Sequence, residues 1–323
     1  MQGQKSPERS AEPEVYVGID VCKDTLDVYL HPLGQKLRAP NTPAGLKTLK
    51  RRLAPMSVSL VVMEATAKFH RQAHRSLHAA GFAVAVVNPL RARLFAEAAG
   101  QLAKTDPIDA RMLALMGQTL DPKALAPTPQ ALEDLQELVR ARAAAITDQT
   151  ALSHQRSASQ TIFLKTELAR RLVTLARYVE RLDREIRTRL EADPSLKRRY
   201  EILTTIPGVG PVAAIALIVG LPELGQCSSK AAALLAGLAP IACDSGARTG
   251  ERHIKGGRAF VRTSLYMAAL AAARYNPQLR EDYERLRNAG KKAKVALTAL
   301  MRKIVVLASV LIKENRVWNP IPA

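Results

Sequence analysis

The sequence has few cysteines and few aromatic residues. Its three cysteines, Cys22, Cys227 and Cys243, lie far apart, with no Cys-x-x-Cys pair among them. This spacing argues against a structural zinc site and a disulfide framework, and it fits a reducing compartment. Aromatic residues make up only 4% of the chain. A platform for stacking single-stranded bases is therefore less supported than contact with a duplex backbone.

The sequence also lacks a recognisable targeting segment. The polar N-terminus has no apolar core of the kind that a signal peptide needs, and residues 1–13 are expected to form a disordered tail. The most apolar late stretch, Val295 to Ile312, is interrupted by Arg302 and Lys303. We therefore expect a buried helix there, not a membrane span, and a cytoplasmic protein with no membrane partner.

Negative charge is scarce. The 323 residues include 48 Lys+Arg against 29 Asp+Glu, which gives a formal net charge of +19. From Gly246 to Lys303 there are 14 basic and 4 acidic residues, so the excess is concentrated late in the chain. A charge of this size predicts a polyanionic partner, with nucleic acid as the first candidate.

Residues 14–125 are predicted to form an α/β domain with a mixed sheet. Short runs rich in β-branched residues indicate strands, the first two of which form a hairpin, and apolar residues at helical spacing separate the later ones. The expected strands are Val15–Asp20, Thr25–Leu30, Ser59–Met63 and Phe82–Val87, and the expected helices are Lys68–Ala80 and Leu90–Ala99.

Four acids stand at predicted element ends in this domain. Asp20 ends the first strand and Glu64 follows a buried one, while Asp106 and Asp109 lie in the first turn of a helix, three residues apart. The two helical acids could be simple capping residues. Together with the strand-end acids, however, they would form a carboxylate cluster that suits Mg²⁺, with Mn²⁺ as an alternative ion.

Residues 126–200 are expected to form a coiled-coil helical hairpin. Leu132, Leu135, Val139 and Ile146 mark one apolar stripe, and a second stripe runs from Leu164 to Leu190 at steps of three and four. The two helices should join around Ser157 to Gln160. This pattern favours a spacer or dimerisation arm over a catalytic role.

Residues 201–323 are expected to form a mainly helical domain. The stretch from Ile206 to Ala214 is typical of a helix-hairpin-helix, in which Gly208 and Gly210 would let backbone N–H groups approach a phosphate. An ordinary Gly-Pro loop fits equally well. Ser245 heads a loop rich in Gly and Arg, which makes it a candidate nucleophile with cations able to clamp phosphates. The candidate cations are Arg248, Arg252, Lys255, Arg258 and Arg262. His253 receives no role.

The chain resembles the transposases of the IS-one-ten (IS110) insertion-sequence family. Eight ordered pieces from residue 17 to about residue 300 carry the resemblance, with V-G-I-D-V-C-K, V-V-M-E-A-T, V-V-N-P-L-R-A-R-L-F-A, A-K-T-D-P-I-D-A-R, I-P-G-V-G-P, A-G-L-A-P, D-S-G and G-G-R-A-F-V-R-T-S-L-Y-M-A-A-L. Three residues depart from the family pattern. Ala67 and Lys68 stand where glycines are expected, and Cys243 stands where a more polar residue is expected.

The resemblance implies a RuvC-like, ribonuclease-H-like N-terminal domain and a serine-bearing transposase domain. It places Asp20, Glu64, Asp106 and Asp109 on the family's DEDD metal-binding tetrad. It also places Ser245 on a serine thought to bond covalently to DNA. A structured noncoding bridge RNA would guide the enzyme to donor and target DNA. The enzyme would act as a homo-oligomer, dimer or tetramer, at the nucleoid of a prokaryote.

Two other functions remain open from the residues. A RuvC-like junction endonuclease would use metal-activated water, so Ser245→Ala would leave cleavage intact. A non-catalytic basic scaffold would need the acids only as caps and strand ends, and salt alone would govern its affinity. The acidic set and the serine together favour the recombinase.

Overall fold

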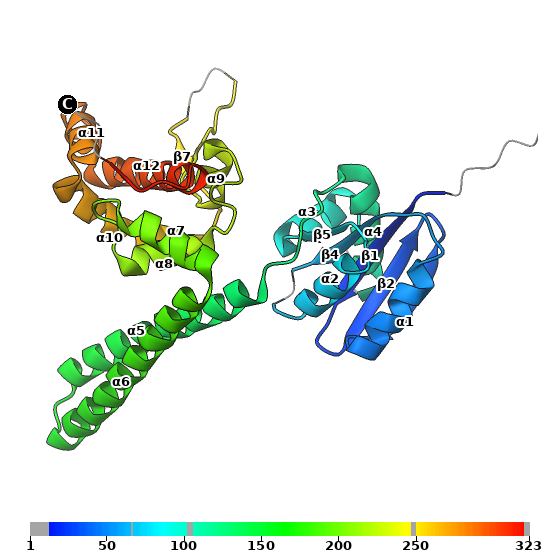
Figure 1. Ribbon diagram of the computed structural model, residues 1–323, viewed down its shortest axis with the longest axis horizontal. Helices are drawn as coiled ribbons and strands as arrows, with labels where there is room; N and C mark the ends of the chain where they lie inside the picture. Colours follow the sequence, from blue (N-terminus) through cyan, green and yellow to red (C-terminus); the bar gives the residue numbers. More distant parts are fainter. Residues whose placement is uncertain (1–12, 66, 102–105, 247–249, 320–323) are drawn as a thin grey trace, which may run out of the picture. The chain divides into compact units, whose positions relative to one another are not determined.

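The computed structural model describes residues 13–65, 67–101, 106–246 and 250–319. Its contacts divide the chain into two units, residues 1–128 and 129–323. Helices and strands of each unit are labelled in Figure 1. The expected tail (apart from Pro13) and Arg248 lie outside the described residues.

Unit 1 is a mixed five-stranded sheet with helices on both faces. The strand order is β3-β2-β1-β4-β5, in which β1 pairs antiparallel with β2 and parallel with β4. The strands are β1 (Val15–Val21), β2 (Thr25–His31), β3 (Gln35–Pro40), β4 (Val58–Glu64) and β5 (Val84–Val87). The predicted mixed sheet is thus confirmed, and β3 extends it at the edge.

The two faces of this sheet pack against different helices. One face buries Val17 and Ile19 under α1 (Pro43–Leu53) and α2 (His70–His78). The other face carries Tyr16, Leu60 and Val62 against α3 (Pro89–Ala98) and α4 (Asp106–Leu120). Because side chains alternate along a strand, the even-numbered residues of β1 and β4 all face α4.

Unit 2 is mainly helical. A two-stranded ribbon, β6 (Pro240–Ile241) with β7 (His253–Ile254), is its only sheet within the described part of the chain. Its helices are α5 (Gln130–Ala158), α6 (Ile162–Ala192), α7 (Pro194–Thr204), α8 (Pro211–Gly220), α9 (Ser229–Leu235), α10 (Ala259–Tyr275), α11 (Pro277–Asn288) and α12 (Ala293–Lys313).

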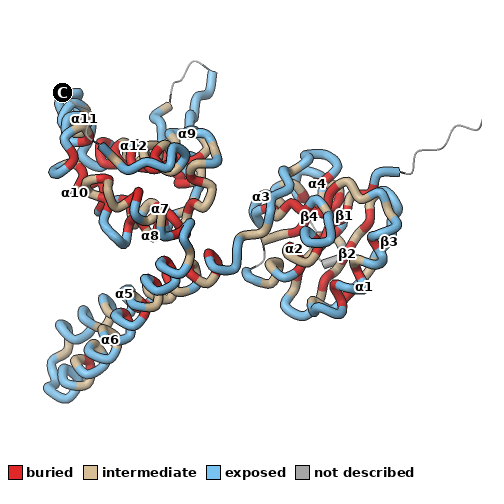
Figure 2. The backbone as a smooth tube through the Cα atoms, in the orientation of Figure 1, coloured by how far each residue is buried: buried red, intermediate tan, exposed pale blue. Residues whose placement is uncertain are grey.

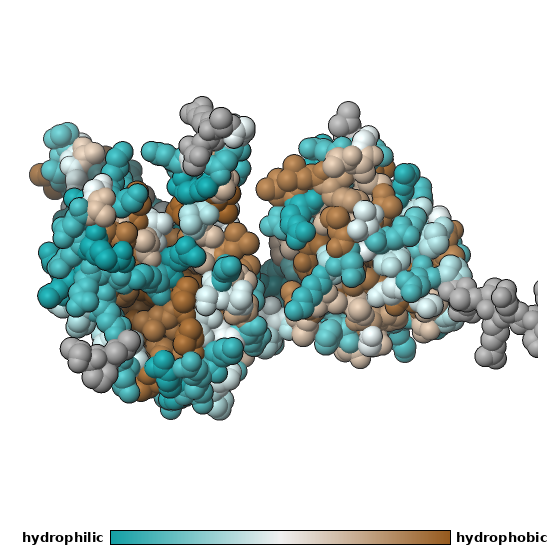
Figure 3. Space-filling model, turned by 90° about the horizontal axis from the view of Figure 1, so that it is seen from above, coloured by the Kyte–Doolittle hydropathy of each residue, from teal (hydrophilic) through white to brown (hydrophobic). Residues whose placement is uncertain are grey.

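Helices α5 and α6 form the long hairpin that the sequence predicts. Leu135 and Ile186 are buried near its base and belong to the same core as α8, α10 and α12. The other end is exposed (Figure 2), where Ile162 and Phe163 are 82% and 72% exposed. Elsewhere, apolar side chains reach the surface in patches among polar ones (Figure 3).

Helix α12 lies at the centre of the unit 2 core. It is long and apolar enough to cross a membrane by length and composition alone, and among the described helices only α12 passes that test. Leu300, Ile304 and Val305 are fully buried within the unit. The predicted buried helix is therefore confirmed.

Candidate active site

Strand register brings two of the predicted acids side by side. Gly18 of β1 pairs with Val62 of β4, and Ile19 pairs with Met63. Asp20 and Glu64 follow at the next step of this parallel pair, at the carboxyl ends of both strands. Both are even-numbered positions, so both lie on the face that α4 covers.

Gly18 allows α4 to lie directly against β1. A Cβ atom at this position would be 1.9 Å from the carbonyl oxygen of Ala110 and 2.4 Å from the backbone nitrogen of Ala114. A Cβ at Gly117 would instead meet Val62 and Tyr16. The helix therefore runs opposite to β1, and its first turn lies at the end where Asp20 and Glu64 stand.

The first turn of α4 carries Asp109 toward this edge. Asp109 and Glu64 line one small pocket of about 270 Å³, together with Arg93 of α3 and Met112 of α4. Arg93 forms an ion pair with Glu97 at 2.8 Å. Asp106 begins α4, but its side chain lies outside the described residues.

Asp27 on β2 is an acid that the sequence reasoning missed. It pairs directly with Asp20 across the β1–β2 ladder, so both side chains lie on the α4 face. Arg38 is 3.6 Å away, yet the Oδ2 atom of Asp27 is buried without a hydrogen-bond partner in the described structure. The register between strands, which no local motif reveals, is the signal that identifies it.

These acids fit a hard divalent cation. Every donor is a carboxylate oxygen, the ligand type that Mg²⁺ prefers, and a buried oxygen without a partner is an atom that a cation could satisfy. Within the described residues, no three His, Cys, Asp or Glu side chains form a ready-made metal-binding group. Asp106 is not part of that search.

Ser245 lies on the exposed loop that connects β6 with β7. Its neighbour Asp244 joins the two sides of this loop. The carboxylate accepts hydrogen bonds from Arg252 at 2.8 and 2.7 Å and from the backbone N–H of Gly250 at 3.1 Å. Asp244 was not singled out from the sequence, and it binds Arg252 at the position directly before the serine.

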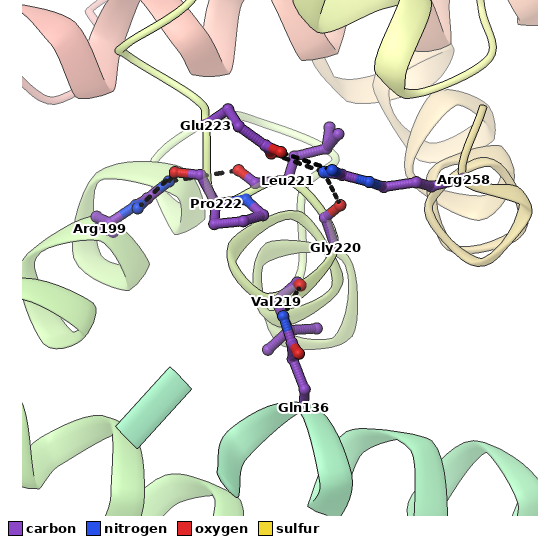
Figure 4. A network of polar contacts seen from close by, with 8 residues as sticks. All are labelled: Gln136, Arg199, Val219, Gly220, Leu221, Pro222, Glu223 and Arg258. Atoms are coloured by element: carbon purple, nitrogen blue, oxygen red, sulfur yellow. Dashed lines mark hydrogen bonds and ion pairs between the residues drawn. The ribbon is translucent and has the colours of Figure 1, made fainter. Parts of the chain in front are cut away.

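Arg258 anchors the end of the same loop, as Figure 4 shows. Its guanidinium donates two hydrogen bonds of 2.6 Å to Glu223 and one of 2.8 Å to the carbonyl of Gly220. Arg199 donates to the carbonyl oxygen of Pro222, and Gln136 to that of Val219. The connection after α8 is therefore held from α5, α7 and the start of α10.

The charge of Glu223 follows from this contact. Burial raises the pKa of the Glu223 carboxyl, but the hydrogen bonds and charge of Arg258 outweigh it, so the pKa lies below its ordinary value. Glu223 therefore stays ionised at neutral pH and holds Arg258 as a fixed ion pair.

Other predicted phosphate ligands differ in their surroundings. Arg262 donates to the carbonyl oxygen of Gly256 at 2.5 Å, so it too braces the loop. Lys255 is exposed. Gly208 has a φ of +98°, and a Cβ there would be 2.5 Å from the backbone nitrogen of Ala272, so packing against α10 accounts for this glycine. Gly210, at the start of α8, has open space around it.

Two family models match the chain, and both describe transposases. The IS110 DEDD transposase model covers residues 17–163. The model of the IS116/IS110/IS902 transposase family covers residues 200–284. The matches define the class of protein as a transposase, an enzyme that acts on DNA. Both models describe one group of mobile elements and together span more than half of the chain. The protein belongs to the IS110 family.

Individual relatives agree with this assignment. The pilin gene-inverting protein of Moraxella bovis is 27% identical over 317 residues, which cover 95% of this chain and 98% of that protein. The 44.8 kDa protein of insertion element IS116 from Streptomyces clavuligerus is 31% identical over 186 residues, 55% of this chain and 44% of that protein. The DEDD model points to dependence on a divalent metal ion.

Proposed function

We propose that this transposase cuts and rejoins donor and target DNA through a covalent phosphoserine bond at Ser245. Asp20, Glu64, Asp106 and Asp109 would hold the divalent ions, with Mg²⁺ as the first candidate and Mn²⁺ as the alternative. The observation that carries the proposal is the contact at Gly18. It lays the first turn of α4 across the carboxyl ends of β1 and β4, where Asp109 and Glu64 line one pocket.

The acids would bring several negative charges together at one edge of the sheet. Asp20 and Glu64 lie on rigid neighbouring strands, and α4 adds its acids from above, so the donor oxygens need little reorganisation. Bound divalent ions would supply Lewis-acid stabilisation of the negative charge on a phosphodiester. Asp27 adds a further negative charge on the same face.

Ser245 would supply the nucleophile. Its Oγ forms a bond to phosphorus as the bond between phosphorus and one deoxyribose oxygen breaks. The serine proton passes to solvent, and the leaving oxygen takes one up. A hydroxyl of another DNA end then attacks the phosphoserine and releases Ser245, so the number of phosphodiester bonds is conserved. Arg252, which binds the adjacent Asp244, and exposed Lys255 would neutralise the phosphate.

The acids and the serine belong to different units of the chain. The proposed reaction needs both on one DNA substrate, either from one protomer or from two. A homo-oligomer, a bridge RNA that selects the DNA, and a location at the nucleoid follow from the family resemblance. The net charge of +19 supports nucleic-acid partners.

A covalent-adduct assay tests the proposal. The protein would be expressed with the noncoding DNA that flanks its gene, supplied with a donor–target plasmid, and quenched with denaturant. We expect DNA attached to protein, dependent on Mg²⁺ and absent from Ser245→Ala and Asp20→Asn. Recombined or nicked DNA without an adduct, unaffected by Ser245→Ala, would instead favour the hydrolytic junction endonuclease.

A further inference from the structure

A second large pocket lies at the base of the serine loop. Its volume is about 750 Å³, and Pro240, His253 and Ile254 of the β6–β7 ribbon form one wall. Helices α11 and α12 form the others. Because the four-residue step from Ile241 to Ser245 spans at most about 14 Å, the pocket and the serine belong to one compact region of unit 2.

The floor of this pocket is apolar, and seven of its sixteen lining residues carry polar or charged side chains. Its size and composition are those of sites that receive a flat organic group, in which scattered polar atoms fix the orientation. Thr298 and Gln278 supply neutral hydrogen-bonding groups. The apolar lining includes Leu238, Ile254, Leu279, Val306, Leu307 and Val310.

The charged groups around the pocket are unevenly paired. Arg252 forms an ion pair with Asp244, and Lys303 forms one with Asp282. Arg302 is partly buried in the lining, and no described residue forms a hydrogen bond or ion pair with it. A partly buried cation without a partner favours an anionic occupant.

We propose that this pocket receives one unstacked nucleotide of the DNA strand whose phosphate Ser245 attacks. The base would rest on the apolar floor, and Arg302 would contact a phosphate of the same nucleotide. Proteins that take a base out of the duplex stack receive it in a snug pocket between aromatic or apolar side chains. The inference rests on the proposed function, because it assumes that DNA reaches Ser245.

The test uses two DNA duplexes of one sequence, one fully paired and one with a single extrahelical 2-aminopurine. Full-length Ser245→Ala protein is titrated with each, so that binding is measured without chemistry. We expect the bulged duplex to bind about tenfold more tightly, with a change in 2-aminopurine fluorescence.

Variants of the pocket locate the effect. Val306→Phe fills the floor and should abolish the preference for the bulge. Arg302→Gln changes no apolar packing and should reduce it. The control Ile146→Phe fills a different pocket, at the base of the α5–α6 hairpin, and should leave the preference intact.

Three results would overturn the proposal: no preference for the bulge, a preference that both pocket variants retain, or an equal preference for an RNA duplex with the same bulge. The adduct assay separates this question from the proposed function. A bulge preference without any serine adduct would keep the pocket and reject the nucleophile. An adduct without a bulge preference would do the reverse.

Discussion

At the scale of single residues, Gly18 decides whether the acids can meet. A methyl group there would run into two backbone atoms of α4, which cannot rotate away as a side chain can. We expect Gly18→Ala to destabilise unit 1 by about 1–3 kcal/mol and to weaken Mg²⁺ binding. Urea unfolding with and without Mg²⁺ measures both effects.

The control for this variant is Gly34→Ala. Gly34 has a φ of +70° but open space around it, so its substitution should cost about 1 kcal/mol from the backbone alone and leave ion binding unchanged. Equal loss of ion binding in both variants would contradict the role given to Gly18.

Asp27 offers a second test on the same face of the sheet. Asp27→Asn replaces the carboxylate that carries the buried Oδ2 atom with a neutral amide. It thereby removes the negative charge opposite Asp20. We expect about tenfold weaker Mg²⁺ binding, measured as a smaller rise in melting temperature with added ion. Asp24→Asn, at an exposed position in the turn before β2, is the matched control. An unchanged ion response in Asp27→Asn would remove Asp27 from the site.

Glu223 gives a prediction about pH. Its pKa in the folded protein lies below the ordinary value, so the folded state binds fewer protons than the unfolded state near that pKa. The ion pair with Arg258 therefore stabilises the fold fully above about pH 4.3 and loses its effect as the pH falls through the folded pKa.

Glu223→Gln should therefore lower the free energy of unfolding at pH 7, and the difference from the parent should shrink below pH 4. Both side chains are about one-third exposed, so solvent screening limits the effect to about 1 kcal/mol. Glu251→Gln, at an exposed carboxylate, is the control. A difference that stays constant from pH 7 to pH 3 would contradict the assignment.

At the scale of elements, the β6–β7 loop depends on Asp244 for its shape. Asp244→Ala removes three hydrogen bonds that join the two sides of the loop, while the core of unit 2 is untouched. We expect adduct formation at Ser245 to slow by at least about tenfold with an unchanged urea midpoint. A parallel loss of stability and activity would show that Asp244 acts on the whole unit.

Elements also show where sequence reasoning succeeds and fails. The strands β1 and β4 and the helix α12 were predicted because apolar runs indicate buried elements. Strand β3 was missed because it is a polar edge strand with one buried residue, Ala39. The hairpin helices were predicted, although Ile146 and Leu164 of the expected stripes are 37% and 46% exposed.

Some residues of the candidate site could likewise be predicted from the sequence, and others could not. Asp20, Glu64 and Asp109 could be selected because they stand at the ends of predictable elements. Arg258 and Arg262 were selected as cations, yet Arg258 binds Glu223 and Gly220, which are distant in sequence, and Arg262 binds the carbonyl oxygen of Gly256. Charge counting cannot reveal these partners. Ala67 has a φ of +44°, which lies in the left-handed region that favours glycine. The backbone conformation for which a glycine is expected is therefore present in this chain with an alanine.

At the scale of the whole molecule, the two units have separate cores. All buried core residues of unit 1 precede residue 117, and those of unit 2 follow residue 131. A protease recognition sequence inserted between Ala126 and Pro127 should therefore allow cleavage into two fragments, each of which unfolds cooperatively. Differential scanning calorimetry before and after cleavage measures this.

The matched control is the same insertion after Asp193, between α6 and α7. That cut divides the unit 2 core, in which Ile186 and Leu217 both take part, so the unfolding transition of unit 2 should disappear. Loss of both transitions after the cut at residue 126 would mean that the units do not fold independently.

The position of α12 in the chain has a consequence for synthesis. Every other described element of unit 2 precedes it, yet Leu300, Ile304 and Val305 fill the centre of that core. The ribosome must therefore release residues 293–313 before the serine loop gains a folded base, whereas unit 1 can close much earlier. A message broken upstream of this helix would yield a folded unit 1 joined to a unit 2 without its central helix, so only complete translation supplies both the carboxylates and a folded base for the serine loop.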